Sequence, residues 1–383
     1  MIDWNLPPDE VAWPVAAGMM RYYEDGGYYP VGGAAQIAES IAEVIEAGGG
    51  QVLCKAPVET VIVDPVTGSA AGVKLKGGVV VAAPVVVSAC GWRSTFEKLV
   101  PRGPMAAAGL DTSDVTCKLN QSHGHICAYV SLDLSPAELG LRPANIHSFP
   151  DVLCAGADTG GYECDVGAFS RDFYDAPLHA DGGGCREALV TITCPSAKDP
   201  WYDGNTGGGR ANVLLLAEGL SEWFAKFEGE SWGRRSAEYK TMKARFEGLF
   251  LDRLYKYYPK ARGHVTHVEL STPLTAKHFI GAPGGASYGL EWTPDHFDAT
   301  LQERYFSPVV KAVPGLFLTG ESIAYGGFYG ALANGFITAS HILGLPHLVG
   351  MLLWDKSQEP PVVFEDGALP PPPPPPAPGG GDA

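Results

Sequence analysis

The chain has 383 residues, of which 45% are hydrophobic, so it is long enough to bury a large core. Its 43 acidic and 27 basic residues give a formal net charge of −16, which argues against a nucleic-acid-binding surface. The sequence contains no run of about 18 apolar residues, so it predicts no membrane-spanning helix. The opening MIDWNLPPDE shows neither the basic nor the apolar region of a signal peptide, and no cysteine or histidine spacing predicts a metal site.

The first hundred residues predict one helix followed by short strands. After a turn at 28–33, residues 34–47 carry an apolar stripe at helical spacing, formed by Ile37, Ile41, Val44 and Ile45. Three glycines at 48–50 end this helix. Apolar runs separated by proline and glycine turns then predict strands at residues 51–54, 58–64, 71–75 and 79–81. Three consecutive valines at 85–87 predict a further strand, buried on both faces.

The middle of the chain mixes strands, glycine-rich loops and helices. Strands are predicted at residues 126–132, 189–194 and 213–217, and glycine-rich loops at 179–186 and 203–210. From 218 to 258 the pattern is helix-rich, with many aromatic side chains available for a core.

The stretch 314–343 predicts a strand, a bend and a helix. A proline-glycine turn precedes the apolar strand 316–319, and Gly320 allows a sharp bend that carries Glu321 and Ser322. The helix that follows would direct its first N–H groups at an anionic or electron-rich ligand. At the carboxyl end of a parallel strand this is where cofactors bind, although an ordinary strand–helix unit would look the same.

After residue 345 the periodicity ends. Residues 348–354 form a short apolar patch that could pack on the body or touch a membrane surface. Seven prolines at 370–376 predict a polyproline or disordered tail, with a weak prospect of binding a partner.

Several of these stretches resemble one superfamily of flavoproteins. They are YYPVGGAAQIAESIAEVIEAGGGQV, VETVIVD, VVVSACGW, PSAKDPWYDG, STPLTAKHFIGAPGGASYGLE and PGLFLTGESIAYGGFYGALANGFITASHIL. Together they resemble the phytoene desaturase superfamily of FAD-dependent oxidoreductases, most closely its all-trans-retinol 13,14-reductase (retinol saturase) branch and next its carotenoid isomerases. The likeness runs from about residue 22 to 345. It implies an α/β fold. In this fold, a flavoprotein has two dinucleotide-binding domains, and a substrate domain of sheet and helices is interleaved with them.

The resemblance also implies a cofactor, a substrate and residues for each. FAD is the implied cofactor, with NAD(P)H as an electron donor, and the implied cofactor-binding residues are Val58, Gly320, Glu321, Ser322, Gly330 and Ala331. An apolar polyene is the implied substrate, bound by Tyr288, Tyr325, Phe328 and Tyr329, with Phe306 and Phe336 as further tunnel aromatics. The catalytic residues are unknown, and Tyr288 and Glu321 are candidates for the proton donor. Because polyenes dissolve in lipid, the resemblance implies membrane association, at the endoplasmic reticulum or in plastids.

Two departures from the family pattern matter. The retinol saturase branch usually reads TG-Q-D after the last strand, whereas this chain has Thr319-Gly320-Glu321-Ser322, nearer to the Gly-Asp-Ser of the isomerases. The G-x-G-x-x-G phosphate-binding turn, expected near the start of such enzymes, is not found before Tyr28. We therefore expect the C-terminal portion of such an enzyme, whose ability to bind flavin is open.

That expectation divides the chain into four parts. Residues 1–100 would be a partial FAD-binding domain, 101–300 a substrate domain, 301–345 the C-terminal FAD-binding unit and 346–383 a disordered tail. Three functions stay open: a polyene reductase, a carotenoid cis–trans isomerase of the same fold, and a truncated non-catalytic fragment or interaction protein.

Overall fold

A computed structural model of the protein describes residues 6, 9–24, 26–149, 188–202 and 208–344. The predicted loop at 179–186, part of the loop at 203–210, the apolar patch at 348–354 and the proline run at 370–376 lie outside these residues. Within the described ranges, no helix has both the length and the apolar character needed to cross a bilayer.

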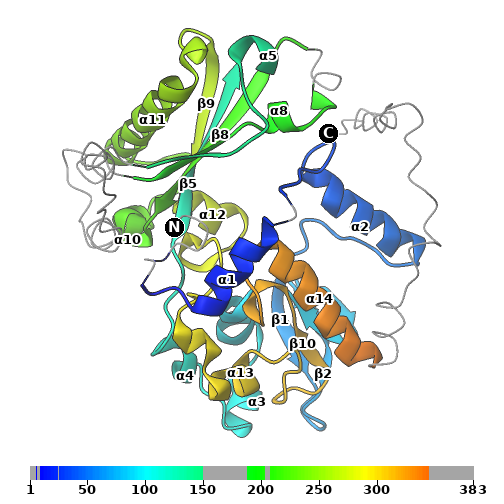
Figure 1. The fold of residues 1–383 in the computed structure, drawn as a ribbon. Helices are drawn as coiled ribbons and strands as arrows, with labels where there is room; N and C mark the ends of the chain where they lie inside the picture. The colour runs from blue at the N-terminus through cyan, green and yellow to red at the C-terminus, as the bar shows by residue number, and fades with distance from the viewer. Residues whose placement is uncertain (1–5, 7–8, 25, 150–187, 203–207, 345–383) are drawn as a thin grey trace.

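The described strands form three sheets (Figure 1). The largest has the order β6-β7-β8-β5-β9, and all its neighbouring strands run antiparallel. The second is the antiparallel sheet β1-β2-β3, and the third pairs β10 with β4 in parallel. The strands are β1 Val58–Val63, β2 Ala70–Leu75, β3 Val80–Ala82, β4 Val86–Ser88, β5 Gly124–Leu132, β6 Ile146–Ser148, β7 Val190–Thr193, β8 Ala211–Gly219, β9 Val265–Ser271 and β10 Leu316–Leu318.

Helices and short helical turns connect and cover these sheets. The longer helices are α1 Trp13–Tyr22, α2 Ala35–Ala47, α11 Ala237–Tyr257 and α14 Gly327–Leu343. The shorter α-helices are α3 Arg102–Ala107, α4 Ser113–Thr116, α5 Pro136–Leu139, α8 Pro195–Lys198, α10 Ser221–Phe224, α12 Pro273–Phe279 and α13 Ala299–Tyr305. The remaining helical turns are η1 Ser94–Leu99, η4 Ala225–Phe227, η5 Pro259–Ala261, η6 Pro283–Gly285, η7 Pro294–Phe297 and η8 Gly320–Ser322.

Two main cores hold the described fold together. In the first, α11 packs Phe246, Phe250 and Leu254 against the five-stranded sheet, where the residues of β5 alternate between buried and more exposed. The second joins residues 61–119 to residues 290–323, so two segments far apart in the sequence share one core. The mixed α/β fold is thereby confirmed, while the domain limits at residues 100 and 300 stay predictions.

Most predicted elements are present, and two expectations are wrong. Residues 51–54 form no strand, and Val52 and Leu53 are exposed. The strand predicted at the three valines is present as β4, but it is not buried on both faces. Val85 and Val87 are 43% and 46% exposed, and in the described structure only β10 pairs with β4. The predicted helix at residues 34–47 is present as α2, and none of its residues is buried in the described structure.

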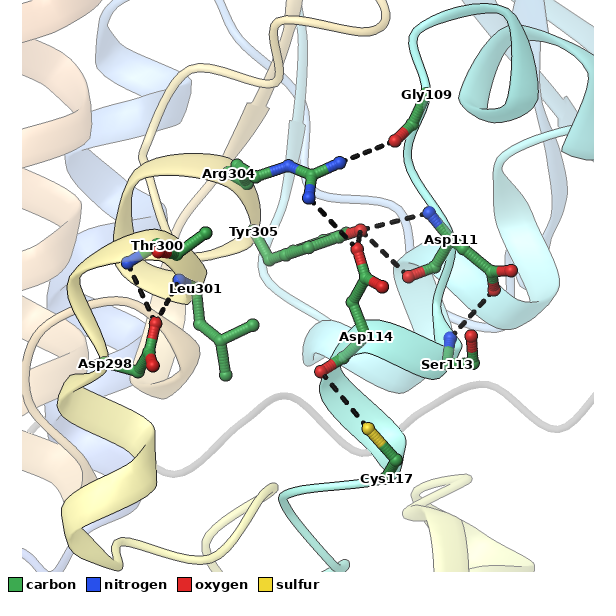
Figure 2. Close-up of polar contacts among 10 residues, drawn as sticks. All are labelled: Gly109, Asp111, Ser113, Asp114, Cys117, Asp298, Thr300, Leu301, Arg304 and Tyr305. Atoms are coloured by element: carbon green, nitrogen blue, oxygen red, sulfur yellow. Dashed lines mark hydrogen bonds and ion pairs between the residues drawn. The ribbon is translucent and has the colours of Figure 1, made fainter.

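A polar network ties α13 to the loop before α4 and to α4 itself (Figure 2). The buried Tyr305 hydroxyl accepts a hydrogen bond from the backbone N–H of Asp111 at 3.0 Å and donates to Asp114 Oδ2 at 2.5 Å. Arg304 Nη1 lies 3.2 Å from the same Asp114 oxygen, and its Nη2 donates to the Gly109 carbonyl oxygen. Burial, aided by Asp114, raises the pKa of Tyr305 to about 12, so this hydroxyl stays a donor at neutral pH. These contacts join segments about 190 residues apart.

His296 makes the stability of this second core depend on pH. Its ring stacks between Trp292 and Phe306, with centroids 4.0 and 4.5 Å away, and Nδ1 donates to the Glu291 carbonyl oxygen at 3.0 Å. Burial lowers its pKa from 6.5 to about 4. The unfolded chain therefore binds a proton between pH 6.5 and 4 that the folded chain does not.

We expect the titration of His296 to lower the free energy of unfolding by about 2 kcal/mol as the pH drops from 8 to 5. The His296→Phe variant keeps a stacking ring and should lose this part of the pH dependence, whereas His267→Phe, on the exposed side of β9, should keep it. Urea denaturation at several pH values measures the slope. An identical slope in His296→Phe and the unmodified protein would contradict this assignment.

Candidate functional site

A cavity of about 650 Å³ opens where the two parallel strands end. Ligand sites of proteins commonly have this size, and in open α/β sheets they lie beyond the carboxyl ends of the strands. Four separate parts of the chain line it, namely residues 89–94 after β4, Gln121, residues 280–290 around η6, and residues 319–335 after β10. Glycine, alanine, aromatic and aliphatic residues dominate the lining, so the cavity suits a flat and largely apolar ligand.

The bend after β10 is built around Gly320. The backbone N–H of Thr319 donates to the Ser88 carbonyl oxygen at 2.9 Å, which continues the parallel pairing to the end of the strand. Gly320 then adopts φ +79°, and a Cβ there would lie 3.3 Å from the Ala89 carbonyl oxygen. The Ser322 hydroxyl accepts a hydrogen bond from the backbone N–H of Trp92 at 3.1 Å. The bend is therefore fixed against the loop that follows β4, as the predicted strand–bend–helix unit requires.

Two polar residues of α14 hold this helix against the bend. Asn334 is fully buried, and its Nδ2 donates to the carbonyl oxygens of Gly320 at 2.7 Å and Tyr325 at 2.9 Å. The Thr338 hydroxyl donates to the Leu318 carbonyl oxygen at 2.8 Å. The sequence analysis did not single out either residue, although polar residues four apart in an apolar helix were a usable signal.

The structure brings five of the ten predicted site residues to the cavity. They are Gly320, Glu321 and Ala331 from the predicted cofactor set, and Tyr288 and Phe328 from the predicted substrate set.

The other five predicted site residues do not line this cavity. Ser322 is buried behind the bend, and Gly330 packs against the Tyr325 backbone. Val58 begins β1, pairs with Leu75 and is 38% exposed. Tyr325 and Tyr329 are largely exposed on the surface.

Of the two further aromatics, Phe306 is buried in the second core and Phe336 is half-buried, and neither lines the cavity. The binding roles assigned to all these residues stay predictions.

Four cavity-lining residues carry buried polar atoms without a hydrogen-bond partner in the described part of the chain. They are Trp92 Nε1, Arg93 Nε, Gln121 Oε1 and Thr319 Oγ1. Buried polar atoms are normally paired, because an unpaired one costs about 1–3 kcal/mol. Two of these atoms donate, Gln121 Oε1 accepts, and the Thr319 hydroxyl can do either. The set fits a heteroaromatic ligand that has both donors and acceptors on its rim, as the isoalloxazine ring of FAD has.

Glu321 is the acidic residue of the cavity lining. Burial raises the pKa of its carboxyl group to about 7, although the backbone N–H of Gly327 donates to it and acts in the opposite direction. A carboxyl group with this pKa exists in both protonation states near neutral pH.

A hydrogen-bonded serine–histidine pair joins the 280–290 segment to β5. The Ser287 hydroxyl, in the cavity lining, is 2.5 Å from Nδ1 of His125, and the His125 ring meets Tyr288 edge-on at 6.0 Å. The sequence did not predict this pair, because its members are 162 residues apart.

The site is thus that of an α/β protein with a cofactor-sized cavity at the ends of two parallel strands. No family model matches the chain. It is similar to curated all-trans-retinol 13,14-reductases, with 29% identity to that of Homo sapiens over 345 residues and 27% to that of Danio rerio over 338 residues. These matches cover 89% and 88% of this chain but 53% of each relative, so the chain spans about half the length of the curated relatives it matches.

One relative carries a different name. A Danio rerio protein named "Inactive all-trans-retinol 13,14-reductase" is 28% identical over 358 residues, covering 92% of this chain and 55% of that protein. The predicted resemblance to the retinol 13,14-reductase branch is confirmed by these matches, and activity does not follow from it.

Solved structures give more distant likenesses. Two redesigned variants of putrescine oxidase are 16–17% identical, with TM-scores of 0.48 and 0.47, over 82% of this chain and 53% of theirs. A Rab GDI from Plasmodium falciparum is 10% identical, with a TM-score of 0.34, over 82% of this chain and 46% of its own.

Proposed function

We propose that this chain carries the ring-binding cavity of an FAD-dependent oxidoreductase that saturates a double bond of a retinoid or carotenoid-like polyene. The observation that carries the proposal is the cavity itself, which lies at the carboxyl ends of β4 and β10 and has unpaired polar atoms among its lining residues. The kinship with proteins named all-trans-retinol 13,14-reductase supports the choice of reaction.

Each wall of the cavity has a part in this proposal. Gly320 and Ala331 would allow a flat ring to approach the backbone of the bend and of α14, and Gln121 and Thr319, which each carry an unpaired polar atom, would lie beside it. When bound, a flavin supplies hydride chemistry. Phe328 and Ile280, at the open side of the cavity, would offer apolar surface to a polyene.

The experiment that tests the proposal is a titration of the full chain with FAD. We expect visible flavin absorbance to stay with the protein through gel filtration, and tryptophan fluorescence, to which Trp92 in the cavity lining contributes, to be partly quenched. The loaded protein, reduced with dithionite without oxygen, should convert retinol to a product that has gained two hydrogen atoms. A protein that remains colourless with excess FAD would overturn the proposal and favour a non-catalytic interaction role.

A carotenoid cis–trans isomerase is the second candidate. The order Gly320-Glu321-Ser322 favours it, since it resembles the isomerase pattern. An isomerase would convert a poly-cis carotenoid to a product of unchanged mass and would leave retinol unchanged.

The electron donor and the membrane are further parts of the proposal. NAD(P)H would reduce the flavin, which is checked by the loss of flavin absorbance when NADPH or NADH is added without oxygen. A lipid-soluble substrate calls for peripheral membrane contact, which vesicle flotation of the full chain measures. The proline run at 370–376 is proposed only as a weak partner-binding segment.

A further inference from the structure

We propose that Glu321 is the acid that gives the substrate its proton when a double bond is saturated in the cavity. This inference rests on the proposed function and adds a residue role to it. It assigns Glu321 to the chemistry of the substrate rather than to binding the cofactor, the role that the family resemblance implies.

The position of the carboxyl group is the first support. Glu321 lies in η8, directly after the strand end, and lines the cavity together with Tyr288 and Gly289. A Cβ placed on Gly289 would be 3.5 Å from Glu321 Oε1, so this oxygen lies beside the 280–290 segment, which also lines the cavity. The other side of the carboxyl group is held by the backbone N–H of Gly327, at the start of α14.

The protonation state is the second support. The raised pKa, about 7, comes from the loss of water around the carboxyl group. A general acid works best with a pKa near the working pH, because it is then often protonated and still gives up its proton readily. The other titratable or charged groups that line the cavity are Cys90 and Arg93 on the β4 side and Tyr288 on the 280–290 side. The Arg93 guanidinium is paired with Glu97, whose Oε1 lies 3.4 Å from Arg93 Nη1.

The proton and electrons of the proposed step balance. Saturation of one C=C bond adds a hydride at one carbon, for which a reduced flavin is the source, and a proton at the other carbon. The O–H bond of Glu321 breaks, and the electron pair left from the C=C bond forms the new C–H bond. The polyene is reduced by two electrons, the flavin is oxidised by two, and the Glu321 carboxylate takes a proton back from water.

The rival proton source is the Ser287 hydroxyl, supplied by His125 behind it. The test therefore compares Glu321→Gln with Ser287→Ala. Glu303→Gln serves as the matched control, because Glu303 is exposed and pairs with Lys311 at 3.0 Å, away from the cavity.

The first readout needs no flavin. Infrared difference spectra of the full chain between pH 5 and 9 should show a carboxyl group that titrates near pH 7. This signal should be lost in Glu321→Gln and kept in Glu303→Gln and Ser287→Ala.

The second readout is single-turnover reduction of the polyene by the flavin-loaded, pre-reduced protein. In the unmodified protein the rate should fall as pH rises through about 7, because the acid form is consumed. Glu321→Gln should bind flavin normally, react roughly 100-fold slower or worse and lose this pH dependence. A Glu321→Gln variant with unchanged rate and pH profile would overturn the inference alone, as would a Ser287→Ala variant that removes the pH dependence instead. Failure of the unmodified chain to bind flavin would overturn the proposed function, and the role of Glu321 with it.

Discussion

Replacing Ala331 by tryptophan is expected to weaken FAD binding at least about 100-fold, or roughly 2.7 kcal/mol. Ala331 lines the cavity on the first turns of α14, one helical turn after Phe328. An indole at this position would fill space in a cavity of about 650 Å³ that the flat ring is proposed to occupy. Absorbance and fluorescence titrations with FAD measure the change.

The matched control is Leu343→Trp, which adds the same ring at the exposed last residue of the same helix. This variant should bind FAD like the unmodified protein, and both variants should unfold at similar temperatures. Equal FAD affinity of Ala331→Trp and the unmodified protein would show that the ring binds elsewhere.

Gly330→Ala is expected to reduce the free energy of unfolding by about 3 kcal/mol, as overpacking of a closed core does. A Cβ at Gly330 would lie 2.2 Å from the Tyr325 carbonyl oxygen, which also accepts the hydrogen bond from Asn334. The turn before α14 would have to move, and with it Gly327, which holds the Glu321 carboxyl group. Urea denaturation measures the loss, and flavin binding should weaken with it.

Gly335→Ala on the same helix gives the opposite result. Its Cβ would lie 3.9 Å from Thr319 Oγ1, an ordinary contact, so the better helix propensity of alanine should stabilise the protein by up to about 1 kcal/mol. Similar effects of the two substitutions would contradict the close packing of residue 330 against the turn.

Local patterns predicted the local structure well. The apolar run 316–319 and the apolar stretch after the Gly320 bend indicated a strand and a helix because each pattern lies within one element, and these became β10 and α14. The predicted strands at residues 126–132 and 213–217 likewise became β5 and β8. The prediction of a strand at residues 51–54 was wrong because a short apolar run does not form a strand without a neighbouring strand to pair with. Here a turn follows instead, in which Lys55 adopts φ +56°.

The cavity could be predicted only in part. The sequence alone could predict Gly320 and Glu321 as cavity residues, because a glycine and an acidic residue directly follow one predicted strand. Trp92, Gln121 and Ser287 were not, because packing alone brings three distant segments to one place.

Helix geometry explains which side chains of α14 meet the cavity. Residues 328, 331, 332 and 335 share one face and line it, whereas Tyr329 points to the surface and Gly330 to the bend. A stricter use of the helical repeat would have excluded Tyr329 from the predicted substrate set.

Photolabelling of the full chain with an azido derivative of FAD, followed by peptide mass spectrometry, tests most directly whether the ring binds at the strand ends. We expect labels within residues 89–94, 280–290 and 319–335, which line the cavity, and competition by unmodified FAD. A second cavity, of about 630 Å³, lies near Tyr28, His147 and Lys198. Labels confined to that second cavity, or spread evenly over the surface without competition, would contradict the account.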